Sequence, residues 1–474
     1  MRKYIIILIS ILLFVISCKK ENYYNGYDAK LSFSTDTIFF DTVFTSVGSV
    51  TKKLKVYNNN DGNLLISNIR LGNGSSSNYR LNINGINSSS ANDIEIEEGD
   101  SLYIFIEVTV DPQNTNTPYV VADSIVFSIN GNMQDIDLRS WGQEANYIDG
   151  RYSSAIIKDT VWTNTKPFLI YNSMMVDTGE TLIIEEGTHI FLHKNSSIYV
   201  MGTLIIKGTK DNPVIIRGDR LEHAYDDVPG QWSRLVFVNP SENNVIDYAE
   251  IKGGIIGVQV GGNIESPSKP NLKITNTKIE HMNYSCLYTI GSTVLASNCV
   301  FADAGFYPVA LLMGGNYEFY HSTIANYWSY ATRTEPSLVI TNNLTANNAM
   351  YVSDLTNAYF GNCIIYGTME DELGLSNDAA AEFNYKFENC IVRNSSLDFS
   401  DNSIYLNVWK DKNPNFINYL NYNWELDTMS NAENKGSLEI INNYPYLPSI
   451  INDINDFDRT TDGNPDLGAY ERQY

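Results

Sequence analysis

One segment gathers most of the side chains that could contact a ligand. It reads YEFYHSTIANYWSYATRTEP, from Tyr317 to Pro336. Its candidate binding residues are Tyr327, Trp328, Tyr330, Arg333 and Glu335. Three of them are flat rings and two are charged hydrogen-bonding groups, a combination typical of grooves that bind a saccharide or a peptide. The alternative is that the rings pack on the outside of the fold beneath a loop.

Metal chemistry has little support in the residue spacing. His189 and His193 lie in THIFLH, whose apolar alternation predicts a strand. On a strand four residues span about 13 Å, which is too far for two ligands of one metal. The Asp-rich stretch 453–466 could offer oxygen ligands to Ca²⁺, but it does not match an EF-hand loop, so a solvated capping turn is favoured. We therefore expect no metal and no cofactor.

A repeat positions these residues. A small residue recurs at Ala249, Thr277, Cys299, Ser322, Asn343, Cys363 and Cys390, in steps of 28, 22, 23, 21, 20 and 27 residues. A nearly constant step of this size predicts a solenoid in which each coil adds one layer. The preceding residue is most often asparagine, at Asn276, Asn298, Asn342, Asn362 and Asn389. Asparagine tolerates left-handed turn geometry and can bond to the next asparagine in a stack, so an asparagine ladder is expected at one coil corner.

The cysteines of this repeat are expected to be core residues. Strands in register stack equivalent side chains about 4.8 Å apart, and cysteine behaves as a small buried apolar residue. Cys363 and Cys390 fall on adjacent coils and could approach disulfide distance. Direct stacking points both side chains the same way, which favours free thiols.

Catalytic acids are not repeated on neighbouring coils. Four places after each small residue stand Gly253, His281, Asp303, Asn326, Asn347, Gly367 and Asn394. Glycoside hydrolases use two carboxyl groups across the scissile bond, and a single aspartate between histidine and asparagine is more typical of turn chemistry. The pattern favours a protein without a catalytic site. If a glycan is cleaved, Asp303, Glu318 and Glu335 are the acids to test.

Two insertions, residues 220–234 and 369–385, interrupt the coils. Loops on a rigid solenoid are common places for binding. Both are therefore candidate places for binding.

The fold is also suggested by resemblance. GETLIIEEGTHIFLHKNSSIYVMGTLIIKGTKDNPVIIRG (179–218), GQWSRLVFV and NNVIDYAEIKGG resemble the opening coils of right-handed parallel β-helix proteins with the pectin-lyase-like fold. The ending DGNPDLGAYE (462–471) is similar to the one that closes many bacterial surface β-helix proteins. The resemblance covers roughly residues 159–474. It implies a family that includes pectate-lyase-like enzymes, polygalacturonase-like hydrolases, adhesins and surface lipoproteins, so it indicates fold rather than chemistry.

The first residues are typical of an export signal. Arg2 and Lys3 precede an apolar run, Tyr4 to Ile16, which is short for a spanning helix and ends at Cys18. The pattern resembles a bacterial lipoprotein signal, which implies cleavage of residues 1–17, lipidation of Cys18 and a tether over 18–28. An ordinary signal peptide or an uncleaved anchor is the alternative.

Residues 29–145 predict a β-sandwich. Apolar residues alternate with polar ones in short runs such as LYIFIEVTV, separated by turn sequences such as NNNDGN. Seven or eight such strands fit an immunoglobulin-like domain, and the segment resembles the Ig-like domains of bacterial surface proteins. A spacer is favoured over a sandwich face that binds a partner.

The chain is thus expected to be all-β, an Ig-like sandwich followed by a right-handed parallel β-helix over residues 146–474 that ends in the DLGAYE segment. Its net charge of −23 excludes nucleic acid as a favoured partner. We expect a membrane-anchored lipoprotein, on the outer membrane or cell surface of a Gram-negative bacterium, that presents loops to a glycan or a surface protein. A polysaccharide lyase or glycoside hydrolase is the alternative.

Overall fold

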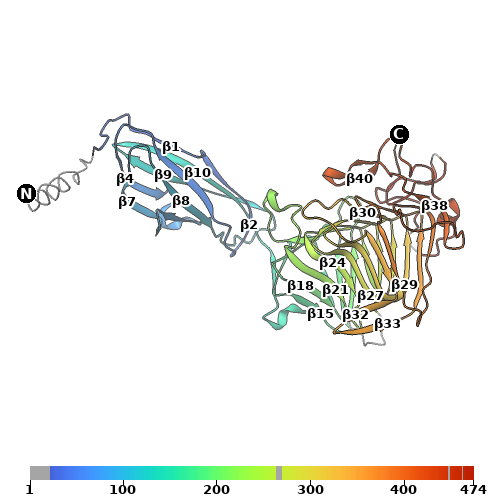
Figure 1. Ribbon diagram of the computed structural model, residues 1–474. Helices are drawn as coiled ribbons and strands as arrows, with labels where there is room; N and C mark the ends of the chain where they lie inside the picture. Colours follow the sequence, from blue (N-terminus) through green and yellow to red (C-terminus); the bar gives the residue numbers. More distant parts are fainter. Residues whose placement is uncertain (1–21, 263–269, 447–448, 462, 474) are drawn as a thin grey trace, which may run out of the picture. The chain divides into compact units, whose positions relative to one another are not determined.

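The computed structural model describes residues 22–262, 270–446, 449–461 and 463–473. They form two compact units, of which the first ends at Glu144 and the second begins at Ala145 (Figure 1). The predicted lipidation site, Cys18, lies outside the described residues. Within the described ranges, no helix has the length and apolar character needed to span a bilayer.

The first unit is a sandwich of two sheets. One sheet has the order β1 (Leu31–Phe33), β3 (Lys52–Asn58), β8 (Ser101–Val108), β5 (Tyr79–Ile83) and β6 (Ile86–Asn87). The other has the order β2 (Thr37–Phe44), β10 (Asn132–Gln143), β9 (Tyr119–Ile129), β4 (Leu64–Leu71) and β7 (Ser90–Ile96).

Alternation along these strands produces the core of the sandwich. In β8, Leu102, Ile104 and Ile106 are buried while Tyr103 and Phe105 are exposed. The buried side chains of both sheets pack into one apolar cluster. The predicted sandwich is confirmed with more strands than expected, and its assignment to the Ig-like class stays a prediction.

The second unit is a parallel β-helix with three sheets, here numbered in the order in which the chain enters them. Sheet I contains β11 (Asn146–Asp149), β14 (Phe168–Tyr171), β17 (His189–Leu192), β20 (Val214–Gly218), β23 (Ala249–Lys252), β26 (Lys278–Met282), β28 (Val300–Ala304), β30 (Thr323–Asn326) and β35 (Ile364–Gly367). Sheet II contains β12 (Ile156–Ile157), β15 (Met174–Val176), β18 (Ser197–Val200), β21 (Trp232–Phe237), β24 (Gly254–Val260), β31 (Leu338–Thr341) and β36 (Leu373–Ser376). Sheet III contains β13 (Thr160–Trp162), β16 (Thr181–Glu185), β19 (Thr203–Lys207), β22 (Asn244–Asp247), β25 (Asn271–Thr275) and β34 (Leu355–Gly361).

Some strands turn a corner and serve two sheets. β27 (Ser285–Ser297) and β29 (Tyr307–Tyr320) run from sheet II into sheet III, and β37 (Lys386–Val392) runs from sheet III into sheet I. β38 (Tyr405–Lys410) pairs with β37 in the last coil. In all three sheets the strands pair in parallel, so equivalent apolar side chains stack in the interior of the helix.

The asparagine ladder lies at the corner between sheets III and I. Asn276, Asn298, Asn362 and Asn389 have positive φ angles of 49°, 52°, 55° and 51°. The side-chain amide of Asn298 donates to Asn276 Oδ1 at 3.1 Å, as expected for stacked coils. Asn407, in β38, continues the ladder with a φ of 53° and was not predicted.

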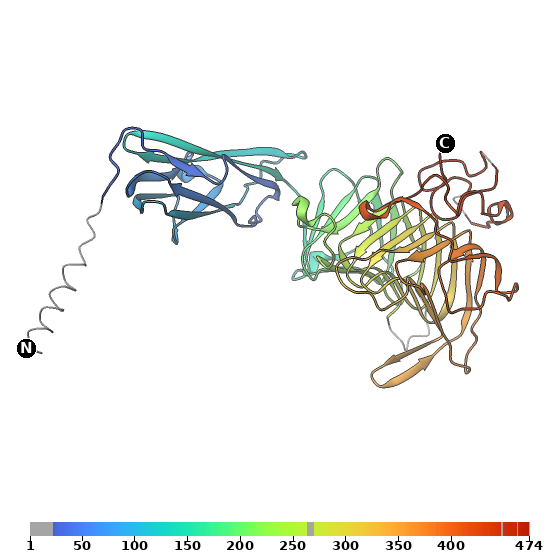
Figure 2. The ribbon, with the colours of Figure 1, turned by 45° about the horizontal axis from the view of Figure 1, so that its top comes forward.

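The predicted coil at Asn343 is wrong. Thr323 of β30 pairs directly with Ile364 of β35, so no coil intervenes between Ser322 and Cys363. Asn343 instead begins an antiparallel hairpin of β32 (Asn343–Ala346) and β33 (Ala349–Val352), which projects from the helix in Figure 2. Asn342 lacks positive φ and binds backbone oxygens of Asp378 and Ala381, so it anchors a loop rather than the ladder.

The cysteine prediction is confirmed. Cys286, Cys299, Cys363 and Cys390 are fully buried and carry free thiols. Cys363 and Cys390 stack on adjacent coils, with the Cys363 backbone nitrogen 3.4 Å from Cys390 Sγ.

After β38 the chain folds back over the outside of the β-helix. This C-terminal segment (residues 411–446, 449–461 and 463–473) contains β39 (Phe416–Asn418), β40 (Asn423–Leu426) and the short helix α2 (Leu438–Asn442). Phe416, Trp424 and Leu467 pack on outward side chains of sheet I such as Val300 and Ile364, forming a second core outside the tube.

Candidate functional site

The candidate site lies at the corner between sheets I and II. Four rings gather there on successive turns of the chain, and they are here called the aromatic corner: Tyr284, Phe306, Trp328 and Tyr330. Tyr284 and Phe306 directly precede β27 and β29 in register, because Ser285 pairs with Tyr307. The 22-residue step between Tyr284, Phe306 and Trp328 therefore places one ring on each of three consecutive coils.

The rings are close to each other and partly open to solvent. The centroids of Tyr284 and Phe306 are 4.7 Å apart, and those of Trp328 and Tyr330 are 5.0 Å apart. The indole of Trp328 lies against the Gly305 backbone, where a β-carbon would be 3.3 Å from Trp328 Cζ2. Phe306 is 42% exposed and Tyr330 is 53% exposed, so ring faces are available to a ligand.

The insertion at 220–234 forms one side of this site. The Tyr330 hydroxyl donates to the Asp227 carbonyl oxygen at 3.0 Å. The Asp227 carboxylate lies 3.6 Å from Lys252 Nζ and 3.6 Å from His281 Nε2. These contacts place the insertion beside the ring of Tyr330.

His281 is neutral at this corner. Burial is the main cause that lowers its pKa, to about 4; the charge of Asp227 opposes this shift and the charge of Lys252 adds to it. The ring of Tyr422, from the C-terminal segment, meets the imidazole edge-on with centroids 4.1 Å apart.

Asp303 is a buried carboxyl group one coil away from His281. Its Oδ1 accepts a hydrogen bond from the Tyr327 backbone nitrogen at 3.0 Å. Burial raises the pKa of Asp303 to about 7, with added repulsion from Glu280 and Asp227. Glu280 is held by the indole nitrogen of Trp424, and burial raises its pKa too. The corner thus combines exposed rings with a carboxyl group that can exchange a proton near neutral pH.

The structure separates the five residues predicted for the site. Trp328 and Tyr330 belong to the aromatic corner. Tyr327 stacks on Tyr419 of the C-terminal segment, with centroids 4.3 Å apart and planes at 24°. Glu335 accepts a hydrogen bond from the Tyr307 hydroxyl at 2.9 Å, beside the corner.

Arg333 lies inside the loop and not on its surface. Its side chain is 3% exposed and pairs with Glu372, which is 0% exposed, at 2.6 Å. Ser337 also donates to Glu372 through its backbone nitrogen and its hydroxyl. This buried pair ties the aromatic segment to the insertion at 369–385, so Arg333 fixes the loop that carries Trp328.

Several residues of the corner were missed from the sequence. Tyr284 and Phe306 carried a usable signal, since their spacing to Trp328 equals the coil step. His281 and Asp303 were compared as coil equivalents, but their convergence with Asp227 depends on how the insertion folds.

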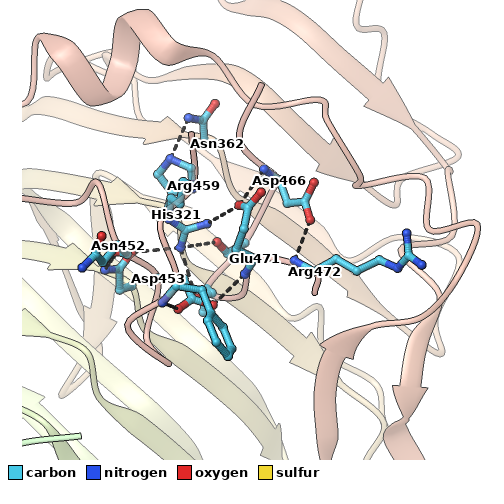
Figure 3. Close-up of polar contacts among 12 residues, drawn as sticks. His321, Asn362, Asn452, Asp453, Arg459, Asp466, Glu471 and Arg472 are labelled. Atoms are coloured by element: carbon cyan, nitrogen blue, oxygen red, sulfur yellow. Dashed lines mark hydrogen bonds and ion pairs between the residues drawn. The ribbon is translucent and has the colours of Figure 1, made fainter. Parts of the chain in front are cut away.

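A second polar cluster lies where the C-terminal segment covers the asparagine ladder (Figure 3). Arg459 is fully buried, pairs with Glu471 Oε2 at 3.4 Å and donates to Asn298 Oδ1 at 3.1 Å. Asp453 Oδ2 accepts from the Glu471 backbone nitrogen at 2.7 Å, and Asp466 is also buried. The expectation of a solvated capping turn is therefore wrong for Asp453 and Asp466, whose buried carboxylates accept hydrogen bonds from backbone nitrogens and lie close enough to Arg459 to favour its charge.

Metal coordination has no matching arrangement in the described part of the chain. No three His, Cys, Asp or Glu side chains among those residues are placed to share an ion.

Comparison with known proteins supports the fold. Residues 257–418 match the sequence model of a family described as a right handed beta helix region. With the parallel register of sheets I to III, this match confirms the predicted right-handed β-helix. No curated protein matches the sequence.

Similarity to solved structures is remote. A family 123 glycoside hydrolase from Clostridium perfringens matches at 11% identity and a TM-score of 0.18, over 25% of this chain and 30% of that one. The periplasmic alginate epimerase AlgG matches at 8% identity and a TM-score of 0.19, over 54% and 85%. The catalytic unit of a GH87 alpha-1,3-glucanase from Streptomyces thermodiastaticus matches at 9% identity and a TM-score of 0.22, over 72% and 84%. Scores of this size assign no function.

Proposed function

We propose that this chain is a lipid-anchored bacterial surface protein that binds a glycan along the aromatic corner of its β-helix. The observation that carries the proposal is the set of rings placed on consecutive coils, with Phe306 and Tyr330 open to solvent. Sugar rings present apolar C–H faces that stack on aromatic side chains, and their hydroxyls bond to nearby polar groups. Asp227 and Glu335 supply such groups beside the rings.

A glycan fits this corner better than a protein partner. Tyr284, Phe306 and Trp328 lie on consecutive coils and so follow the helix axis at the coil spacing, which suits an extended chain of repeating units. The polar groups among them are few and held in place by Tyr307 and Lys252, as expected of a small-ligand site.

The anchor is proposed from the sequence, because Cys18 ends an apolar run that is too short to span a bilayer. Two acyl chains on a processed cysteine would hold the protein stably at the outer membrane or cell surface. Replacing Cys18 with Ala should release the protein from the membrane fraction or leave the precursor uncleaved. Processing and retention equal to the parent protein would contradict the anchor.

The binding test uses the detergent-solubilised full chain on an array of bacterial and host glycans. Trp328→Ala and Phe306→Ala should each weaken binding by more than about 1 kcal/mol, roughly fivefold in Kd. Tyr199→Ala is the matched control, because Tyr199 is as exposed as Phe306, 42%, but lies in β18 away from the corner. Binding that is unchanged in both corner variants, or weakened equally in the control, would refute this site.

Glycan cleavage is the second candidate function, and Asp303 is the observation that favours it. A carboxyl group with a pKa near 7, beside Asp227 and a neutral His281, is suited to transfer a proton at neutral pH. The same glycans should be assayed for new reducing ends and unsaturated ends. Cleavage that Asp303→Asn abolishes without loss of binding would establish an enzyme in place of a binding protein.

A further inference from the structure

The outer face of one sheet of the sandwich combines basic and aromatic side chains, although the chain as a whole is acidic. Its outward side chains include Lys53 and Lys55 of β3, Arg80 of β5 and Glu107 of β8. Three cations against one carboxylate make this face positive, whereas the whole chain has a net charge of −23. The face is therefore suited to an anionic partner.

Exposed rings form the middle of this face. Tyr103 and Phe105 are each 42% exposed, and their planes are 20° apart with centroids separated by 6.3 Å. The ammonium of Lys55 lies 5.5 Å from the Tyr103 ring centroid and 4.9 Å from that of Tyr57. The pairing of Lys53 with Phe105 places another cation next to this flat platform.

A hollow of about 740 Å³ adjoins the platform. Phe105, Arg80 and Glu107 line it together with Asn82, Asn87 and Ser88. The hollow is large enough for a few sugar residues, and its amides and hydroxyl can bond to sugar hydroxyls.

Arg80 is the residue in this hollow whose side chain is suited to bind an anion. It stands opposite Glu107 in the strand register, yet the Glu107 carboxylate accepts from the Thr51 hydroxyl at 2.6 Å instead. Across the described residues, no hydrogen bond or ion pair involves the Arg80 guanidinium. A guanidinium binds a carboxylate through two parallel hydrogen bonds, which a neutral ligand does not provide.

We propose that this face of the sandwich binds an acidic glycan, with Arg80 on a sugar carboxylate and Phe105 and Tyr103 beneath the sugar rings. The sandwich is then a second binding module and more than a spacer. The inference depends on residues of the first unit alone, so it stands or falls separately from the aromatic corner.

The test measures binding of three uronic acid probes to the solubilised full chain by biolayer interferometry: oligogalacturonate, oligomannuronate and hyaluronan oligosaccharides. At least one should bind, and its Kd should rise tenfold or more in Arg80→Gln and about fivefold in Phe105→Ala. Arg80→Lys should retain part of the affinity, because it keeps the charge but loses the two-fold contact. Arg139→Gln is the control, since Arg139 is an exposed arginine, 54%, on the other sheet.

Two further probes test whether the face recognises a sugar carboxylate. Glycerophosphoglycerol, the headgroup of phosphatidylglycerol, carries a phosphate instead, and methyl-esterified oligogalacturonate has the same sugars without the free carboxylate. Neither should bind with comparable affinity. The proposal is overturned if no uronic acid probe binds, or if binding is unchanged in Arg80→Gln and Phe105→Ala. It is also overturned if the esterified probe or the headgroup binds with an affinity comparable to that of the uronic acid probe. Thermal unfolding of each variant shows whether the sandwich is intact.

Discussion

Replacing Arg459 with methionine should release the C-terminal segment from the β-helix. The guanidinium is fully buried and donates to Asn298 Oδ1 at 3.1 Å and to the backbone oxygens of Gly468 and Ala469 at 3.2 and 3.1 Å. It also pairs with Glu471 Oε2 at 3.4 Å. Methionine fills similar volume but makes none of these contacts.

The cost follows from the charges that remain. Asp453, Asp466 and Glu471 are all buried in the same cluster, and each of their charges favours the protonated form of Arg459. Removing one partner of a buried ion pair costs about 3–5 kcal/mol, because the other charge stays desolvated. This loss is smaller than the free energy of unfolding of a typical domain, about 5–15 kcal/mol. The segment should therefore detach locally before the domain unfolds globally.

Hydrogen exchange read by mass spectrometry measures this release. Peptides covering 416–426 and 452–461 should exchange roughly 150- to 5000-fold faster in Arg459→Met, which is 3–5 kcal/mol expressed as an equilibrium ratio. Peptides from the interior strands β26 and β28 should stay protected. In Arg151→Met, which loses an exposed ion pair with Asp149, the change should be under about 1 kcal/mol.

A double variant separates charge from packing. Adding Glu471→Gln to Arg459→Met removes one buried negative charge that Arg459 no longer balances. The double variant should therefore regain part of the protection from hydrogen exchange. Equal exchange in Arg459→Met and the parent protein would refute the view that this arginine holds the segment.

Two further predictions concern the interior and the acid. Cys363→Asp should abolish soluble folding, since an unpaired buried charge costs several kcal/mol, whereas Cys363→Ala or Ser should fold; equal expression of all three would place Cys363 outside the core. Asp303→Asn should leave stability unchanged below about pH 4 and raise it progressively up to pH 7, because burial raises the pKa of Asp303 to about 7 in the folded protein, above its ordinary value of 3.8, and ionisation therefore favours unfolding. The gain above pH 7 should approach 4 kcal/mol, about 1.4 for each pKa unit, and denaturant unfolding that shows no dependence on pH would contradict it.

The stacked part of the fold could be predicted because it repeats. Cys299, Cys363 and Cys390 share one environment, and each is preceded by an asparagine with positive φ. The same local signal failed at Asn343, where ITNNLTAN has the composition of a coil corner but forms a hairpin. The sequence of a single coil does not specify whether the next strand joins the stack. β30 pairs with β35, which follows only after the β32–β33 hairpin, so this pairing depends on contacts between residues far apart in the sequence.

The candidate site was predictable only for the rings. Trp328 and Tyr330 were chosen because they lie in one short segment rich in flat rings and charged groups, and both lie in the aromatic corner. Arg333 was grouped with them because charged hydrogen-bonding groups commonly accompany flat rings in a binding groove. Its partner Glu372 lies 39 residues further along the chain, and nothing in the local sequence specifies that pairing.

The C-terminal segment also sets the proton state of the aromatic corner. Tyr422 covers the imidazole of His281, and burial is the main reason that its pKa lies near 4 and not near 6.5. Tyr422 lies within the segment beside Trp424, whose ring packs in the same core as Leu467 and Ala469, next to the Arg459 cluster. Loss of the Arg459 contacts should therefore admit water to His281, and its pKa should rise toward the ordinary value. An NMR titration of the His281 ring, assigned with His281→Gln, tests this coupling. If Arg459→Met increased exchange in 416–426 but left the His281 titration unchanged, the burial of His281 would have to come from the insertion at 220–234.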